Sequence, residues 1–192
     1  MSLNTALRNE RPLVDKFESP DRLLMGAGPS RVHEDVLKVM SQTTIGHLDP
    51  NIIVMMDQLK DMLRYIFQTN NDMTFPVSGP GSLGMEAVVN NMVEPGDEVL
   101  IAINGVFGTR MAEVAKRAGA KVITTEDDWG KAVDPNKIEK ALKSNPDVKI
   151  VGFVHAETST GALSNAAEIC RLAKDNNAMT IVDTVTSLGG VP

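Results

Sequence analysis

The 192-residue sequence predicts an α/β fold in which a mainly parallel sheet carries helices on both of its faces. From residue 73 onward, short apolar segments alternate with amphipathic ones, which is the order of repeated strand–helix units. The apolar segments are continuous rather than alternating, as in strands that are buried on both faces of a parallel sheet. In addition, the glycine-rich loop Ser78-Gly79-Pro80-Gly81-Ser82 joins the first apolar run to the helix that follows it.

Each element is predicted from its periodicity and from its end signals. Asp134-Pro135 predicts one helix start, with a capping aspartate before a proline, and Gly119 predicts a helix end. The predicted strands are residues 73–77, 98–103, 121–125, 148–155 and 179–183. The predicted helices are residues 32–42, 51–69, 83–93, 107–118, 136–144 and 165–174. Residues 1–24 are expected to form an irregular arm and residues 25–192 one domain, with the methionines of the helix over 51–69 filling its core.

The composition is that of a globular domain with one sizeable core, at 42% hydrophobic and 23% charged residues. A net charge of −6 and no clustered basic residues argue against a nucleic-acid partner. No apolar run approaches the ~20 residues of a membrane span. The single cysteine, Cys170, excludes an internal disulfide and suits a reducing compartment, so the cytoplasm is the expected location. We expect its side chain to be buried as a small hydrophobe.

Candidate functional residues follow the predicted strands, because ligands of open parallel sheets bind at the carboxyl ends of the strands. The loop 78–82 follows the first strand, Phe107 lies just after the second, residues 155–161 follow the fourth, and Asp183 ends the fifth. A glycine loop that opens a helix exposes backbone N–H groups beside a partial positive charge. The sequence therefore predicts a phosphate site at residues 78–82.

Two phosphorylated ligands fit this pattern. Gly79-x-Gly81-x-x-Gly84 matches the dinucleotide fingerprint of an oxidoreductase, but the second strand ends in Asn104 where that fold places an acidic residue. Pyridoxal phosphate needs a phosphate cup, a flat partner for its ring and a carboxylate at its pyridine nitrogen. The loop, Phe107 and Asp183 match those needs, although each residue alone is also explained by a turn, by core packing or by a loop contact.

Six segments, taken together, resemble a known family. They are residues 24–30, 46–50, 78–82, 104–108, 155–161 and 182–190. In this order they resemble the class V, fold type I aminotransferases, specifically the alanine–glyoxylate and serine–pyruvate aminotransferase group. The resemblance implies the large cofactor-binding domain of fold type I, with pyridoxal 5'-phosphate as the cofactor and no metal.

The resemblance also implies which residues contact the phosphate and the two faces of the cofactor ring. Pro80, Gly81 and Ser82 would hold the phosphate. Phe107 would stack on the pyridine ring, where many relatives have tryptophan and either ring offers a π-face. Val185 would pack on the opposite face of the ring.

Further roles concern the polar atoms of the cofactor and the substrate. Thr158 would hydrogen-bond the phenolic oxygen, and Asp183 would pair with the ring nitrogen. Gly26 would let the backbone approach the substrate carboxylate, because it has no side chain to block it. For His155 and Glu157 the resemblance leaves a hydrogen-bonding role behind the site and a purely structural role equally open.

In this family a lysine downstream of the Asp183 motif forms an imine with the cofactor, and an arginine of the C-terminal domain binds the substrate carboxylate. Neither has a counterpart before Pro192. We therefore expect a sheet that is incomplete at Pro192, and the N-terminal segment of an enzyme that is inactive alone. The whole enzyme would transfer an amino group from a small amino acid, of alanine or serine type, to glyoxylate or another small 2-oxo acid.

The expected partner is a second copy in a homodimer, or a complementing C-terminal fragment. The alternative is a stand-alone, non-catalytic remnant that binds or regulates a partner.

Overall fold

The computed structural model describes residues 16–191, in two units that are described separately. The first unit ends at Met40 and the second begins at Ser41. The described part of the first unit contains one helix, α1 (Glu34–Met40), which is shorter than the predicted helix over 32–42 and has no buried residue. Gly26 lies in this unit, before α1.

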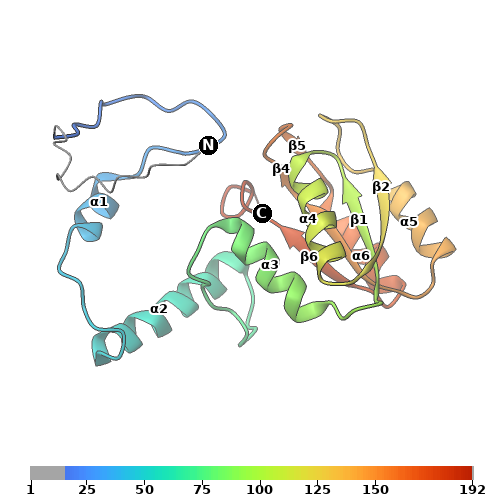
Figure 1. The fold of residues 1–192 in the computed structure, drawn as a ribbon, viewed down its shortest axis with the longest axis horizontal. Coiled ribbons are helices and arrows are strands. Elements are labelled where there is room, and N and C mark those ends of the chain that lie inside the picture. The colour runs from blue at the N-terminus through green and yellow to red at the C-terminus, as the bar shows by residue number, and fades with distance from the viewer. Residues whose placement is uncertain (1–15, 192) are drawn as a thin grey trace, which may run out of the picture. The chain divides into compact units, whose positions relative to one another are not determined.

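The second unit contains a four-stranded parallel sheet in the order β2-β1-β3-β6 (Figure 1). Its strands are β1 (Glu98–Ile103), β2 (Lys121–Glu126), β3 (Val148–Val154) and β6 (Met179–Asp183). The bounds of β1 and β6 are those that the sequence predicts, and β2 and β3 differ from the prediction by one residue each. The predicted parallel sheet is confirmed.

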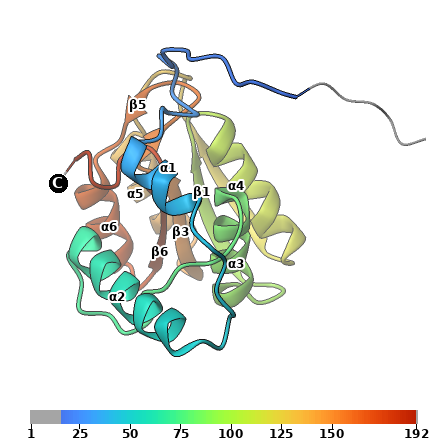
Figure 2. The ribbon, with the colours of Figure 1, turned by 90° about the vertical axis from the view of Figure 1, so that its left-hand side faces the viewer.

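Helices cover both faces of this sheet, as Figure 2 shows. One layer contains α3 (Gly81–Met92) and α4 (Val106–Arg117), and the other contains α5 (Pro135–Ser144) and α6 (Ala166–Asp175). Successive residues of β1 point to opposite faces, so Val99 and Ile101 pack with α3 and α4, whereas Leu100 and Ala102 pack with α5 and α6. These two apolar clusters are the reason that the strands read as continuous hydrophobic runs.

A glycine in β3 leaves space for two apolar side chains of the core beneath α4. A Cβ atom on Gly152 would lie 2.6 Å from Cδ1 of Ile101 and 2.7 Å from Sδ of Met111. A larger residue would therefore require the side chains of Ile101 and Met111 to move. The glycine therefore belongs to the close packing between β1, β3 and α4.

Two predictions about strands differ from the structure. Residues 73–77, predicted as a strand, form none, because none of the described strands pairs with them and a strand exists only where a neighbour supplies backbone hydrogen bonds. Conversely, an unpredicted antiparallel hairpin joins β4 (Ala156–Glu157) to β5 (Ala162–Leu163). Two-residue strands are too short to show a period in the sequence.

Helix α2 (Pro50–Phe67) begins one residue before the predicted helix over 51–69 and ends two residues before it. The carboxylate of Asp49 accepts the backbone N–H of Asn51 at 2.8 Å, and Pro50 occupies the first helical position. The expectation that its methionines fill the core is wrong, because no residue of α2 is buried and Met62 is 60% exposed. Helical spacing reveals an apolar face but does not reveal whether the described chain covers it.

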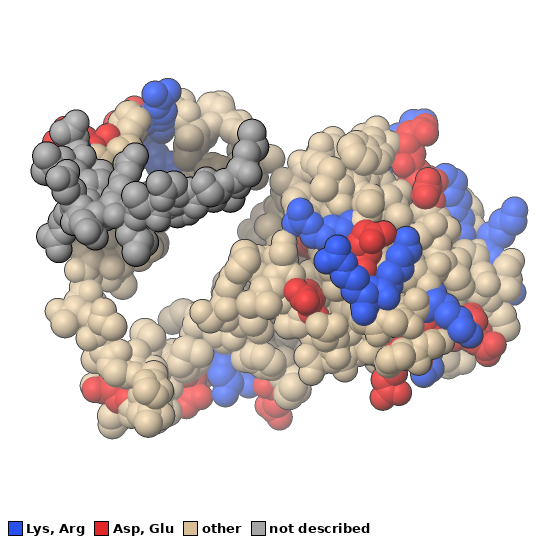
Figure 3. All heavy atoms as spheres, in the orientation of Figure 1, with Lys and Arg blue, Asp and Glu red and all other residues tan. Residues whose placement is uncertain are grey.

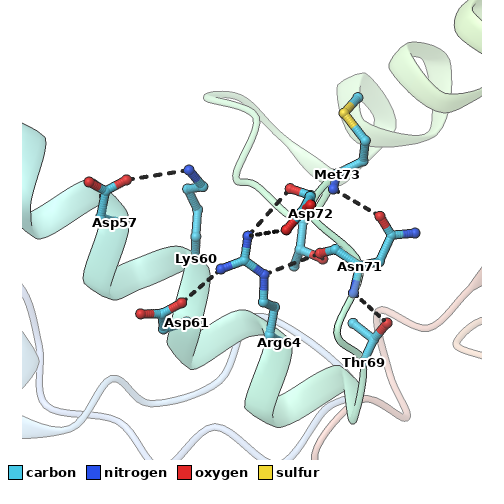
Figure 4. Close-up of polar contacts among 9 residues, drawn as sticks. Asp57, Lys60, Asp61, Arg64, Thr69, Asn71, Asp72 and Met73 are labelled. Carbon is cyan, nitrogen blue, oxygen red and sulfur yellow. Dashed lines mark hydrogen bonds and ion pairs between the residues drawn. The ribbon is translucent and has the colours of Figure 1, made fainter.

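Arg64 ties the end of α2 to the turn that leads toward α3 (Figure 4). Its Nε donates to the backbone oxygen of Asn71 at 3.1 Å, and its Nη1 donates to Asp61 at 2.7 Å. Nη2 donates to the backbone oxygen of Asp72 at 3.4 Å. One guanidinium thus fixes the path by which the chain approaches the glycine loop.

Cys170 is half-buried and packs against the cluster of α5 and α6, with Sγ 3.9 Å from Oγ1 of Thr180. The expectation that its side chain is buried as a small hydrophobe is therefore only partly confirmed. Among residues 16–191, no helix is both long and apolar enough to cross a membrane. On the face of the second unit seen in Figure 3, acidic and basic side chains are interspersed.

Candidate functional site

The carboxyl ends of three neighbouring strands meet at one edge of the sheet. Asp183 ends β6 in register with Val154, the last residue of β3, and α4 starts after Ile103, the last residue of β1. The hairpin β4–β5 follows β3 at the same edge. The parallel topology therefore brings the residues after these strands toward one place.

The N-terminus of α3 is open. Pro80 is its N-cap residue and makes no side-chain hydrogen bond to the helix. The amides of Leu83 and Gly84 donate to the carbonyl oxygen of Pro80 at 2.8 and 3.4 Å. The amides of Gly81 and Ser82 have no hydrogen-bond partner among the described residues. Two free N–H groups and the positive end of the helix dipole therefore make this helix end a suitable seat for an anion.

The turn after β6 lies next to this seat. The carboxylate Oδ1 of Asp183 accepts the backbone N–H of Val185 at 3.0 Å, which fixes the orientation of the carboxylate. Cγ2 of Val185 lies 3.7 Å from where a Cβ atom on Gly81 would stand. The predicted phosphate loop and the predicted carboxylate therefore lie at the same edge, with the exposed Val185 beside the loop.

The N-terminus of α4 is closed by the side chains of the β4–β5 hairpin. Oε2 of the fully buried Glu157 accepts the amides of Phe107 and Gly108 at 3.1 and 3.2 Å. Its Oε1 accepts the hydroxyl of Ser159 at 2.6 Å and the amide of Ser159 at 3.2 Å. The hydroxyl oxygen of Ser159 in turn accepts the amide of Val106 at 3.0 Å. All three first-turn amides of α4 are thereby satisfied.

Arg110 connects the two helix ends. Its Nη1 donates to Oγ of Ser82 at 2.8 Å, and its guanidinium carbon lies 5.1 Å from the centre of the Phe107 ring. The second contact is a cation–π interaction, and the first places a positive charge at the start of α3. The sequence analysis missed Arg110, although its position three residues after Phe107 on a helix predicts that the two side chains are neighbours.

Thr158 also faces this edge. Its hydroxyl is hydrogen-bonded to that of Thr186, which belongs to the turn after β6. His155 contributes its backbone, because its amide donates to the carbonyl oxygen of Asp183 at 2.9 Å. The predicted residues of the second unit are thus brought to one edge of the sheet: Pro80, Gly81, Ser82, Phe107, Thr158, Asp183 and Val185. Gly26 belongs to the first unit.

The dinucleotide interpretation gains nothing from the structure. Asn104, at the position where that fold places its ribose-binding acid, is fully buried, and its Nδ2 donates to the backbone oxygen of Lys131 at 2.9 Å. Its amide holds a loop and presents no group at the surface.

Comparisons with known proteins agree with one another. Residues 23–192 match the model of the family aminotransferase class-V. The alanine–glyoxylate aminotransferase of Drosophila melanogaster is 40% identical over 182 residues, which are 93% of this chain and 46% of that protein. A crystal structure of alanine–glyoxylate aminotransferase from Nostoc sp. is 44% identical with a TM-score of 0.91, over 96% of this chain and 48% of that one.

A crystal structure of ureidoglycine–glyoxylate aminotransferase from Bacillus subtilis is 39% identical with a TM-score of 0.89, over 93% of this chain and 46% of that one. The chain spans about half the length of the relatives that it matches.

Proposed function

Because the chain belongs to the class-V aminotransferases, a family and fold that depend on pyridoxal phosphate, we propose that its second unit holds this cofactor for amino-group transfer. The amino donor is a small amino acid of alanine or serine type, and the acceptor is glyoxylate or another small 2-oxo acid. The relatives named for alanine, ureidoglycine and glyoxylate support this substrate class. The observation that carries the proposal is the open N-terminus of α3 beside the Asp183–Val185 turn.

The residues at this edge suit the cofactor. The amides of Gly81 and Ser82, with the helix dipole of α3, suit a phosphate dianion, and Pro80 sets the entry to the helix. Arg110 adds a positive charge through its contact with Ser82. The phosphate end of the cofactor would therefore meet only donors and positive charge, with no described carboxylate bonded to these amides.

Other residues at this edge suit the pyridine ring of the cofactor. Asp183 has one carboxylate oxygen engaged by the amide of Val185. Its other oxygen, which accepts no hydrogen bond from residues 16–191, would hold a proton on the pyridine nitrogen. Phe107 and Val185 would enclose the two ring faces, and Thr158 would bond the phenolic oxygen. When bound, the protonated ring serves as an electron sink for the bonds of the substrate α-carbon.

Gly26 would admit the substrate carboxylate to its backbone, and this assignment places residues 25–192 in the cofactor-binding large domain. The imine-forming lysine is proposed to lie outside residues 1–192. Lysines 116, 131, 137, 143 and 149 are instead held in ion pairs with carboxylates. On this proposal, residues 1–192 alone bind the cofactor weakly and do not turn over.

We propose that the whole protein is a cytoplasmic homodimer. Helix α2 supports this, because its apolar side chains are exposed, with Ile53 at 55%, Tyr65 at 85% and Phe67 at 48%. An exposed apolar face of this extent marks a surface that is covered in the whole protein, and in the proposed homodimer the second copy covers it. Light scattering of the protein expressed from its complete gene would give twice the monomer mass. A monomer, or a complex with a second fragment, would contradict the homodimer.

The test of function uses the protein expressed from its complete gene. With pyridoxal phosphate it is expected to show a bound-cofactor absorbance band that changes on addition of L-alanine and returns with glyoxylate. Asp183→Asn is expected to abolish this cycle, whereas Asp175→Asn, at the exposed end of α6, serves as the control. A wild-type protein that binds no pyridoxal phosphate would overturn the proposal.

A further inference from the structure

We infer that Glu157 is the residue that positions Phe107 for cofactor binding. Its buried carboxylate caps the first turn of α4 and thereby fixes the ring that follows. The inference rests on the proposed function for the use of that ring, but the cap itself is a property of the chain.

The contacts show a site built around one carboxylate. Glu157 is fully buried, and it accepts two amides of α4 together with the amide and the hydroxyl of Ser159. A buried carboxylate is unfavourable unless donors surround it, and here four donors and the positive end of a helix dipole do so. The partners lie about fifty residues apart in the sequence, so the cap joins two separate segments of the fold.

Gly105 gives independent evidence that this place is shaped for Glu157. A Cβ atom on Gly105 would lie 2.5 Å from Cδ of Glu157 and 2.6 Å from Oγ of Ser159. The φ of Gly105 is 173°, which is extended backbone that any residue adopts. The glycine is therefore needed for the space that it leaves to the carboxylate, and not for its conformation.

The cap acts on the candidate site through Phe107. Its amide is one of the two that bind Oε2, and its ring contacts Arg110, which bonds Ser82. Loss of the carboxylate would leave the first turn of α4 with unpaired amides and would free the ring and Arg110 together. The same carboxylate also occupies the N-terminus of α4, so that a phosphate meets free amides at α3 and not at α4.

Glu157→Gln tests the inference in the protein expressed from its complete gene. A carboxamide keeps the size but turns one acceptor into a donor that faces amide donors. We expect pyridoxal phosphate to bind about tenfold more weakly, the size that leaving a buried donor unpaired implies, and the circular-dichroism band of the bound cofactor to shrink. Glu113→Gln, on the exposed face of the same helix, is the control and should change neither quantity.

Hydrogen exchange without cofactor separates this inference from the proposed function. In Glu157→Gln the amides of Phe107 and Gly108 should exchange faster, while those of α6 keep their protection. If the wild type binds no pyridoxal phosphate, the function fails but the exchange result still tests the cap. If the wild type binds it and Glu157→Gln keeps its affinity, its dichroism and its exchange rates, the inference is overturned.

Should Glu157→Gln fail to fold, Ser159→Ala takes its place. This variant removes the hydroxyl that links Glu157 to the Val106 amide and leaves the carboxylate on Phe107 and Gly108. The same changes are expected at smaller size. A variant that loses global stability with no change in the cofactor dichroism would show that the network is merely structural.

Discussion

Helices α3 and α4 pack against each other on one face of the sheet, and their N-termini differ in what the first-turn amides contact. The amides of Gly81 and Ser82 in α3 have no partner among residues 16–191. Those of Val106, Phe107 and Gly108 in α4 are all bonded to Glu157 or Ser159. Both helices have the same dipole, so the difference comes from the side chains that the neighbouring loops supply.

The two helix N-termini at this edge therefore differ in how well each would accept an anion. Any helix N-terminus attracts negative charge, but an internal carboxylate satisfies α4 in advance. The open end of α3 is then the better place for a phosphate. On the proposed function, selectivity at this edge would therefore depend both on Glu157, which occupies one helix end, and on the loop that leaves the other end free.

The largest effect is expected from giving α3 the kind of cap that α4 has. In Pro80→Asp a carboxylate at the N-cap position would accept the first-turn amides of α3. Affinity for pyridoxal phosphate should fall about 100-fold, or ~3 kcal/mol, because two anions compete for one site. The stability of the cofactor-free protein should rise by ~1 kcal/mol through capping. Titration calorimetry and thermal unfolding measure the two changes.

Pro80→Ala is the control for this variant, since alanine neither caps nor carries charge. Because Pro80→Ala loses only the fixed backbone entry that Pro80 gives to α3, it should lose much less cofactor affinity than Pro80→Asp. If Pro80→Asp and Pro80→Ala bind the cofactor equally well, the open end of α3 is not the phosphate site.

A smaller effect is expected at Arg110, which joins the two helix ends. Arg110→Gln removes the positive charge beside Ser82 and should reduce the preference for pyridoxal phosphate over unphosphorylated pyridoxal about tenfold. Arg117→Gln, at the exposed end of the same helix, should leave that preference unchanged. Competition binding of the two ligands measures this preference. If the wild type and Arg110→Gln show the same affinity ratio, Arg110 does not contribute to phosphate recognition.

The difference between the two helix ends also explains what the sequence predicts and what it does not. The glycine loop, Phe107 and Asp183 are local signals, because each lies next to a strand or helix end that periodicity locates. The cap of α4 depends on a contact between Phe107 and Glu157 across about fifty residues, which no local pattern encodes. For that reason the sequence leaves the role of Glu157 open, whereas the structure shows that its carboxylate caps α4.

The two wrong predictions, a strand over residues 73–77 and a buried face on α2, also concern contacts between distant parts of the chain. Residues 73–77 have the composition of a strand, but whether they form one depends on a partner strand and not on composition. The apolar face of α2 is visible as a period, whereas its exposure is a matter of tertiary contacts. Burial of a helix face and pairing of a strand are long-range properties. A single sequence identifies only which segments are able to be buried or paired.

The next smaller effect concerns how the chain reaches the open helix end. Because α3 has no side-chain cap of its own, its entry depends on the turn that Arg64 holds (Figure 4). Arg64→Ala should reduce the free energy of unfolding by ~1–2 kcal/mol, as expected for the loss of side-chain hydrogen bonds. Cofactor affinity should fall only about twofold, since the seat itself is intact. Denaturant titration checks the first quantity, and a larger loss of affinity would make the turn part of the site.

The smallest effect is expected far from both helix ends, at the amino end of the sheet. There Asp97 bonds Lys149 at 2.5 Å and accepts the amide of Glu94 at 3.0 Å. The pKa of Asp97 is held below 3.8 by the hydrogen bond from Lys149 and, to a smaller extent, by that from the Glu94 amide. The hydrogen bond to Asp97 in turn holds the pKa of Lys149 above 10.5.

The lowered pKa of the Asp97 carboxyl stabilises the fold above pH 3.8, and this stabilisation is lost as the pH falls through the lowered pKa. The raised pKa of the Lys149 amine stabilises the fold below pH 10.5, and this stabilisation is lost as the pH rises through the raised pKa. The stability difference between wild type and Asp97→Asn should therefore be constant from about pH 4 to 10 and narrow outside that window. Lys149→Met removes the same pair and should give the same profile. Cofactor affinity should not change in either variant, because this pair lies at the opposite end of the strands from the N-termini of α3 and α4. A fall in affinity would show that the two ends of the sheet are coupled and that the contrast between the helix ends is not set locally.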